Sequence, residues 1–233
     1  MSAPIPIRHA ATVIVLRHRH TAPAILMGQR GARAAFMPNK FVFPGGAVDA
    51  ADAQVPLARP LCDICTARLT QDPTAGIEPV TPQTLAVAAI RELFEETGQI
   101  IAQQGSWPDP PAAWLSFAAH GRPDAVPLQF VFRALTPPGR PRRFDARFFL
   151  VDADHLASDP DDFSAASDEL SHLQWVPLTE AREFDMPFIT EIVLAEIQAR
   201  VSDPSPPASV PYFKNNDEAN LFLRLHGQPQ PDT

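Results

Sequence analysis

The sequence predicts an α/β fold, because short apolar runs typical of β-strands lie on both sides of one long segment rich in helix-forming residues. Early strands are expected at 11–16, 24–27 and 40–43, and the helix over 84–97. The chain has 233 residues, of which 45% are hydrophobic and 20% charged, which is enough for one large core. We therefore expect a single domain over 1–201.

The first two strands should form a hairpin, since the polar turn from His18 to Thr21 separates them. The third strand ends at the pair Gly45-Gly46. A glycine pair directly after an apolar strand implies a positive φ or a close backbone approach. At such a place a carbonyl oxygen can reach a metal ion and an amide can reach a phosphate.

The long helix has recognisable ends. Thr81 and Pro82 match the N-cap and N1 positions, and Gly98 matches the left-handed residue that ends a helix. One stripe of the helix is suited to burial. This stripe consists of Ala86, Ile90, Leu93 and Thr97. With that side buried, Glu92 and Glu96 are expected to face a cleft.

Later elements are predicted in the order helix, strand, strand, strand and helix. They lie within 106–120, at 129–135, at 143–151, at 170–178 and over 187–201. A Pro-Pro-Gly turn joins the first two strands of this group, which predicts a hairpin. The tail, 202–233, is rich in proline, and its segment 212–225 is expected to dock on the domain.

Glu92, Glu95 and Glu96 are the most informative residues of the chain. On a helix they stand at i, i+3 and i+4 and project from one face. At about 6 Å each like-charged pair costs roughly 3 kcal/mol at an effective dielectric of about 20, but well under ~1 kcal/mol in water. In a cleft they predict a bound cation, whereas on an open surface they predict a solvated face with Arg91 and Glu95 paired. The upstream glycine pair favours the cation.

The segment from Arg91 to Gly98 and the upstream glycines resemble the signature of the Nudix hydrolases. That signature is Gly, five residues, Glu, seven residues, then Arg-Glu-apolar-any-Glu-Glu-any-Gly-apolar, and Gly46 would open it. Two departures stand out. Asp52 replaces the first Glu of the signature, and residues 53–90 (90 − 52 = 38 positions) replace the usual seven. About 31 residues are therefore inserted within the motif.

One branch of this family carries such an interruption, the acyl-CoA and coenzyme A diphosphatases of the peroxisomal type and their bacterial relatives. The resemblance to this branch extends over about residues 12–190. The matching blocks are Gln29-Arg30, Phe36-Met37-Pro38, residues 48–52, Leu135-Thr136-Pro137-Pro138 and residues 143–149. The resemblance implies a Nudix fold, which is an α/β/α sandwich with a mixed β-sheet between helices. A helical or loop insertion at 53–83 is expected to fold over the site entrance or against a second subunit.

The resemblance also implies hydrolysis of a diphosphate bond with Mg²⁺ or Mn²⁺, ions for which carboxylates are suitable ligands. It assigns as metal ligands Glu92, Glu95, Glu96, the carbonyl of Gly46 and, as an auxiliary acid, Asp52. Asp52 has an alternative role as the partner of Arg91. Two residues are catalytic candidates for the general base, Glu92 first and Glu169 second. The alternative for Glu169 is an exposed acid without a role.

CoA carries a diphosphate and a 3′-phosphate, so basic residues are candidate substrate contacts. Arg143 and Arg147 lie in the matching hairpin block, and Arg30 and Lys40 precede the glycine pair. A solvated or structural role is the alternative for each. The leading function is hydrolysis of CoA or acyl-CoA to 3′,5′-ADP and (acyl-)phosphopantetheine. The alternatives are hydrolysis of another nucleoside diphosphate derivative, such as ADP-ribose or NADH, and a non-catalytic binding or regulatory module.

The formal charge of −8 disfavours a nucleic-acid partner, and the longest early apolar run, 10–16, is too short to span a membrane. We therefore expect a cytoplasmic protein whose partner is a small nucleotide-derived substrate. The resemblance leaves a homodimer open.

Two cysteines, Cys62 and Cys65, form a C-x-x-C motif inside the insertion. Such a motif can be half of a zinc site or a redox pair. A closed zinc site needs two more ligands, and no second C-x-x-C or spaced pair of histidines follows. Two reduced thiols on an insertion helix are the simplest interpretation, with the redox pair as the alternative.

Overall fold

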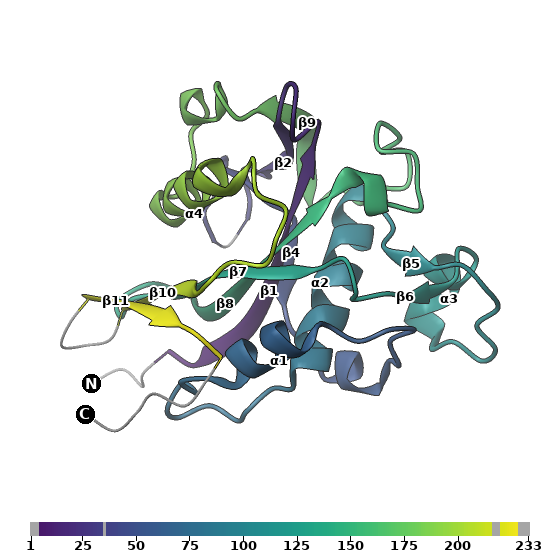
Figure 1. The fold of residues 1–233 in the computed structure, drawn as a ribbon, viewed down its shortest axis with the longest axis horizontal. Coiled ribbons are helices and arrows are strands. Elements are labelled where there is room, and N and C mark those ends of the chain that lie inside the picture. Colours follow the sequence, from purple (N-terminus) through teal and green to yellow (C-terminus); the bar gives the residue numbers. More distant parts are fainter. Residues whose placement is uncertain (1–4, 35, 216–219, 228–233) are drawn as a thin grey trace.

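The computed structural model describes residues 5–34, 36–215 and 220–227 (Figure 1). The strands are β1 (Ile7–Arg17), β2 (Ala24–Arg30), β3 (Phe41–Val42), β4 (Gly45–Ala47), β5 (Ala102–Gln103), β6 (Arg122–Pro123), β7 (Gln129–Leu135), β8 (Arg143–Asp152), β9 (Leu170–Pro177), β10 (Val210–Asn215) and β11 (Asn220–Leu225). The α-helices are α1 (Asp63–Thr70), α2 (Pro82–Thr97), α3 (Leu115–Ala118) and α4 (Phe188–Arg200).

The central sheet is mixed, with the strand order β11-β10-β7-β8-β1-β2-β3. Strand β4 pairs with β1, and β9 pairs with β2. The long parallel pair of β1 and β8 forms the middle, running from Ile7 opposite Arg143 to Leu16 opposite Asp152. The predicted hairpins of β1 with β2 and of β7 with β8 are confirmed. The tail adds β10 and β11 to the sheet, through a parallel pairing of β10 with β7.

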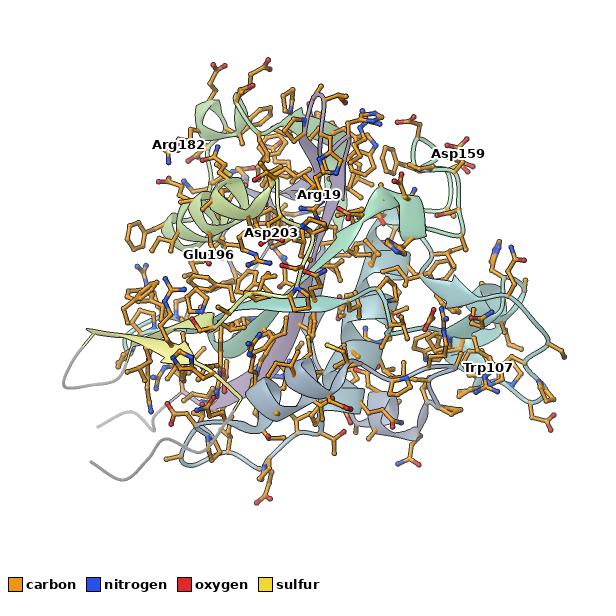
Figure 2. The ribbon with its side chains drawn as sticks, viewed as in Figure 1. Arg19, Trp107, Asp159, Arg182, Glu196 and Asp203 are labelled. Atoms are coloured by element: carbon orange, nitrogen blue, oxygen red, sulfur yellow. The ribbon has the colours of Figure 1, made fainter. Side chains whose placement is uncertain are left out.

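Helices cover the two faces of this sheet (Figure 1), so the predicted α/β sandwich is confirmed. Helices α1 and α2 lie on one face and α4 on the other. Two apolar clusters fill the two layers, one under α2 and one under α4. Arg19, which is labelled in Figure 2, ties the last turn of α4 to the sheet. Its guanidinium donates to Asp152 at 2.7 Å and to the carbonyl of Val201 at 3.0 Å.

The caps of α2 are those that the sequence predicts. The Thr81 hydroxyl accepts a hydrogen bond from the Thr84 N–H at 3.1 Å, and Pro82 stands in the first turn. Gly98 ends the helix with a φ of 75°, a left-handed conformation that favours glycine. The predicted stripe is buried. Its members are Ala86, Ile90, Leu93 and Thr97.

The insertion packs on the protein's own sheet. Its apolar residues Leu61, Cys65 and Leu69 join the cluster under α2, because α1 has this one face to bury. Arg68 of α1 donates to the carbonyls of Ala208 and His226, so α1 also holds the tail.

A charged network lies beneath the chain that follows α1. Asp145, which is fully buried, accepts two hydrogen bonds from Arg133, at 2.9 and 2.7 Å, and one from the Thr74 hydroxyl at 2.6 Å. Arg133 also donates to the carbonyl of Asp72 at 2.9 Å, and Arg147 lies 3.1 Å from the Asp145 carboxylate. Despite burial, the neighbouring arginines hold the pKa of Asp145 below its usual value. The network therefore fixes the insertion to the sheet.

Some elements were not predicted. β4 is three residues long and β5 and β6 are two residues each, which is too short for an alternating pattern to reveal. Within the described residues, no helix is both long enough and apolar enough to cross a membrane.

Replacing Asp145 should cost much stability. Asp145→Asn leaves Arg133 and Arg147 buried without a counter-charge, and breaking a buried ion pair in this way costs about 3–5 kcal/mol. Urea denaturation measures the loss. Asp161→Asn is the control, since the Asp161 side chain is 72% exposed and its pair with Arg17 is a surface pair. Equal stability of the two variants would contradict a structural role of the network.

His9 should make stability depend on pH. Its Nδ1 accepts from Arg147 at 2.8 Å and its Nε2 donates to the Glu78 carbonyl at 2.8 Å, so it is neutral in the folded protein. Burial and Arg147 lower its pKa from 6.5, against the opposing effects of the Glu78 hydrogen bond and of Asp145. The unfolded chain therefore binds the proton first, and stability falls as pH drops below 6.5 towards the folded pKa.

This slope is measured as the difference in unfolding free energy between the wild type and His9→Gln, at about pH 7.5 and about pH 5.5. Taking the difference removes contributions from other titrating groups. The wild type should lose more stability than the variant on acidification, and parallel losses would contradict the neutral state of His9.

Candidate active site

The candidate site lies where α2 meets β4. Glu92 and Glu96 are both buried, 9% and 1% exposed, and they face the glycine pair of β4. The Gly45 N–H donates to Glu96 Oε2 at 2.7 Å. A Cβ atom on residue 46 would lie 2.5 Å from both carboxylate oxygens of Glu92. Only glycine lets the helix come this close, which is the close approach expected of this pair.

Arg91 organises the acids of the site. Its Nη1 donates to Glu92 at 2.9 Å and to Glu95 at 3.0 Å. Its Nη2 donates to the Ala47 carbonyl at 3.0 Å, which joins the helix to β4. Glu92, Glu95 and Glu96 are the three glutamates of the Nudix-like motif, or box glutamates. One guanidinium thus fixes two of them, Glu92 and Glu95, relative to β4, the strand that carries the glycines.

Asp52 is held by the same arginine. Its two oxygens accept from Arg91 Nε at 2.7 Å and Nη2 at 3.1 Å, and Oδ2 also accepts from the Asp49 N–H at 2.8 Å. The Asp52 side chain is only 1% exposed. The structure therefore places Asp52 as the partner of Arg91, which is the alternative that the sequence left open. The shorter Asp reaches this arginine although 38 residues separate the two positions (90 − 52 = 38).

The buried carboxylates resist ionisation. Burial raises the pKa of Glu92 to about 7, with Glu95 and Glu169 adding to the effect and Arg91 opposing it. Burial raises the pKa of Glu96 well above its usual value, and Glu92 and Glu169 raise it further. The Glu95 side chain is 47% exposed. Full ionisation of Glu92 and Glu96 therefore requires a positive charge beyond that of the neighbouring protein groups.

The donor set fits a hard divalent cation. Glu96 Oε1 is buried and has no hydrogen-bond partner, which is unusual for a carboxylate oxygen and leaves it available to an ion. In the described parts of the chain, no three His, Cys, Asp or Glu side chains converge closely enough to enclose a metal ion. Arg91 engages Glu92 and Glu95 instead, so a turn of Glu95 away from Arg91 would be needed to complete a three-glutamate site.

Glu169 and Arg30 lie at the border of the site. Arg30, at the end of β2, donates to Glu169 at 3.1 Å, just before β9. Glu169 is 56% exposed, yet it raises the pKa of both Glu92 and Glu96, so its charge acts on the buried carboxylates. Lys40 pairs with Asp185, which precedes α4. The structure therefore brings Glu169 and Arg30 to the box glutamates.

The two predicted substrate contacts on β8 bond to other protein groups in the structure. Arg147 is 4% exposed and is enclosed with His9 and Asp145 under the insertion, so its prediction as a substrate contact is corrected to a structural role. Arg143 donates to the Thr136 carbonyl at 3.2 Å across the β7–β8 hairpin.

Sequence reasoning missed two backbone groups of the site, the Gly45 N–H and the Ala47 carbonyl. The glycine pair indicated a close approach but not which atoms would meet. It also missed the pair of Arg30 with Glu169, since pairing across 139 positions leaves no local pattern.

No protein-family model matches this chain. A Nudix hydrolase of known crystal structure from Alicyclobacillus acidocaldarius is 31% identical, with a TM-score of 0.61, over 86% of this chain and 94% of that one. Putative nudix hydrolase 7 of Caenorhabditis elegans is 29% identical over 192 residues, which are 72% of this chain and 51% of that protein.

The acyl-coenzyme A diphosphatase NUDT19 of Gallus gallus is 29% identical over 211 residues, 68% of this chain and 55% of that protein. The chain thus spans about half the length of the curated relatives that it matches. The interrupted motif, the glycine–glutamate contact and the match along nearly the whole Alicyclobacillus structure agree, and the chain belongs to the Nudix hydrolase family.

Proposed function

We propose that this protein is a Mg²⁺- or Mn²⁺-dependent diphosphatase that hydrolyses CoA or acyl-CoA to 3′,5′-ADP and (acyl-)phosphopantetheine. The observation that carries the metal-dependent part is the state of Glu96. It is 1% exposed, its pKa is raised well above the usual value, and one of its oxygens has no partner. A buried carboxylate in this state is costly unless a cation accompanies it.

The metal ligands of the proposal are Glu92, Glu95 and Glu96. Divalent ions held by these carboxylates would neutralise the diphosphate and lower the pKa of the attacking water. The chain supplies the positioning. The Gly45 N–H holds one oxygen of Glu96, and Arg91 orients Glu92 while Asp52 fixes Arg91. The Gly46 carbonyl remains a proposed backbone ligand.

Two acids are proposed for the removal of the proton from water. Glu92 is the first candidate, since it is buried beside the glycine pair and Arg91 orients its carboxylate. Glu169 is the second, because it is more than half exposed and its charge acts on the box glutamates. Its pair with Arg30 would have to open for this role.

The CoA assignment rests on the similarity to NUDT19 and on Arg30. Arg30 Nε is buried without a hydrogen-bond partner, so one donor of this guanidinium is free beside the box glutamates. Arginine suits phosphate oxygens. Lys40 and Arg143 remain further candidates for the phosphates of CoA.

Loss of one box carboxylate should abolish most activity. Glu96→Gln keeps an oxygen for the Gly45 N–H but removes the charge, so we expect kcat/KM to fall at least about 100-fold, which is about 2.7 kcal/mol. The value of kcat/KM is measured by chromatography of the products formed from CoA, acyl-CoA, ADP-ribose and NADH, with Mg²⁺ and with Mn²⁺. Glu183→Gln is the matched control, since Glu183 is an exposed acid next to α4.

The products separate the possible functions. Release of 3′,5′-ADP from CoA that Glu96→Gln loses and Glu183→Gln keeps supports the proposal. Cleavage of ADP-ribose or NADH alone would retain the site and reject the CoA assignment. No cleavage of any of the four compounds would favour a non-catalytic module.

Divalent ions should also stabilise the wild-type fold. A ligand at one hundred times its Kd adds about 2.7 kcal/mol to the free energy of unfolding, which raises Tm by several degrees for a chain of this size. We expect Mg²⁺ to raise Tm in the wild type and in Glu183→Gln, but far less in Glu92→Gln/Glu96→Gln. A thermal melt with and without Mg²⁺ measures this. The same rise in all three proteins would place the ion elsewhere.

A further inference from the structure

We propose that Cys62 and Cys65 form a redox-active dithiol, which closes to a disulfide by exchange with a small-molecule disulfide and reopens with a thiol. The pair lies in the insertion, and the proposed hydrolysis uses neither residue. The inference therefore does not depend on the proposed function.

The two cysteines stand at the start of α1. Cys62 is the N-cap residue, and its carbonyl accepts the first helical hydrogen bond, from the Thr66 N–H at 3.0 Å. Cys65 follows one turn later, at i+3, so both side chains lie on one side of the helix. A C-x-x-C motif is an arrangement in which disulfide oxidoreductases place their reactive thiols.

The two thiols have different surroundings, as the two steps of disulfide exchange require. Cys62 is exposed, whereas Cys65 is fully buried and its Sγ accepts from the Phe130 N–H at 3.5 Å, beside the bulge of β7. Burial raises the pKa of Cys65 to about 12, and contact with the Cys62 thiol adds to this effect. A dissolved disulfide can reach Cys62 alone, and Cys65 is placed to resolve the product.

Neither apolar packing nor zinc binding accounts for both cysteines. A buried cysteine can serve as a small apolar residue, which explains Cys65 in the cluster under α2 but not the exposed Cys62 beside it. A zinc site needs further ligands, and none of the described residues completes a group of three with these two cysteines. A dithiol that opens and closes uses both positions.

The exchange balances with glutathione disulfide as oxidant. The Cys62 thiolate attacks one sulfur of that disulfide, which forms a mixed disulfide and releases one glutathione thiolate. Cys65 then attacks the Cys62 sulfur, loses its proton to the second departing glutathione and completes the intramolecular bond. Two protein thiols are oxidised and one glutathione disulfide is reduced to two thiols.

Intact-mass spectrometry of the full chain tests this. The protein is incubated with glutathione disulfide, unreacted thiols are alkylated, and adducts are counted. The wild type should lose both alkylatable thiols without retaining glutathione, and dithiothreitol should restore both. Cys65→Ser should keep one glutathione on Cys62, and Cys62→Ser should take up none, because Cys65 is buried.

Three results would overturn the proposal. They are a wild type that stays fully alkylatable, a wild type that stops at the mixed disulfide, and stoichiometric zinc that protects both thiols. Circular dichroism of the serine variants shows whether they are folded. If either variant unfolds, the loss or retention of both thiols in the wild type still decides the question.

Discussion

The close contact between helix α2 and strand β4 is the constraint on which the rest of the site depends. The Glu92 carboxylate occupies the space that a side chain at position 46 would need, so only glycine fits there. The Gly45 N–H donates a hydrogen bond to Glu96. A residue with a Cβ at 46 would meet Glu92 at 2.5 Å and push the helix away from the strand. This contact brings two buried carboxylates together at the cost of their solvation, so the fold itself creates the need for a counter-charge.

The long insertion is tolerated because its two ends are joined by side chains as well as by the chain. Asp52 precedes the insertion and Arg91 follows it, and the ion pair between them joins the two sides of the insertion directly. Lengthening a loop costs little entropy, since closure depends only on the logarithm of its length. The inserted residues recover that cost by burying α1 on the sheet and by joining Thr74 to the Asp145 network.

Local sequence patterns predicted the long helices and strands. Contacts between residues far apart in the sequence determined which side chains are buried. Helix α2 could be delimited from Thr81 and Gly98, because caps act within one turn. By contrast, Arg143 and Arg147 share one face of β8 by strand alternation, yet only Arg147 is enclosed. The chain after α1 bonds to Asp145 through Thr74 and to His9 through the Glu78 carbonyl, and these two residues surround Arg147 through contacts that no local pattern reveals. The box glutamates were predictable for the opposite reason, since their spacing on one helix is itself local.

The charges of the site explain which acids are left for a metal ion. Arg91 neutralises Asp52, and Arg30 neutralises Glu169, so the closest partner of each arginine is an acid other than Glu92, Glu95 and Glu96. Among the three glutamates, Glu92 and Glu95 share Arg91 Nη1. Glu96 instead has the Gly45 N–H and the weaker influence of the Arg30 charge. In the proposed enzyme, a divalent ion would take over the charge of Glu92 and Glu96, both of which now have a raised pKa. Binding of the ion and ionisation of the two buried acids would then be a single coupled event.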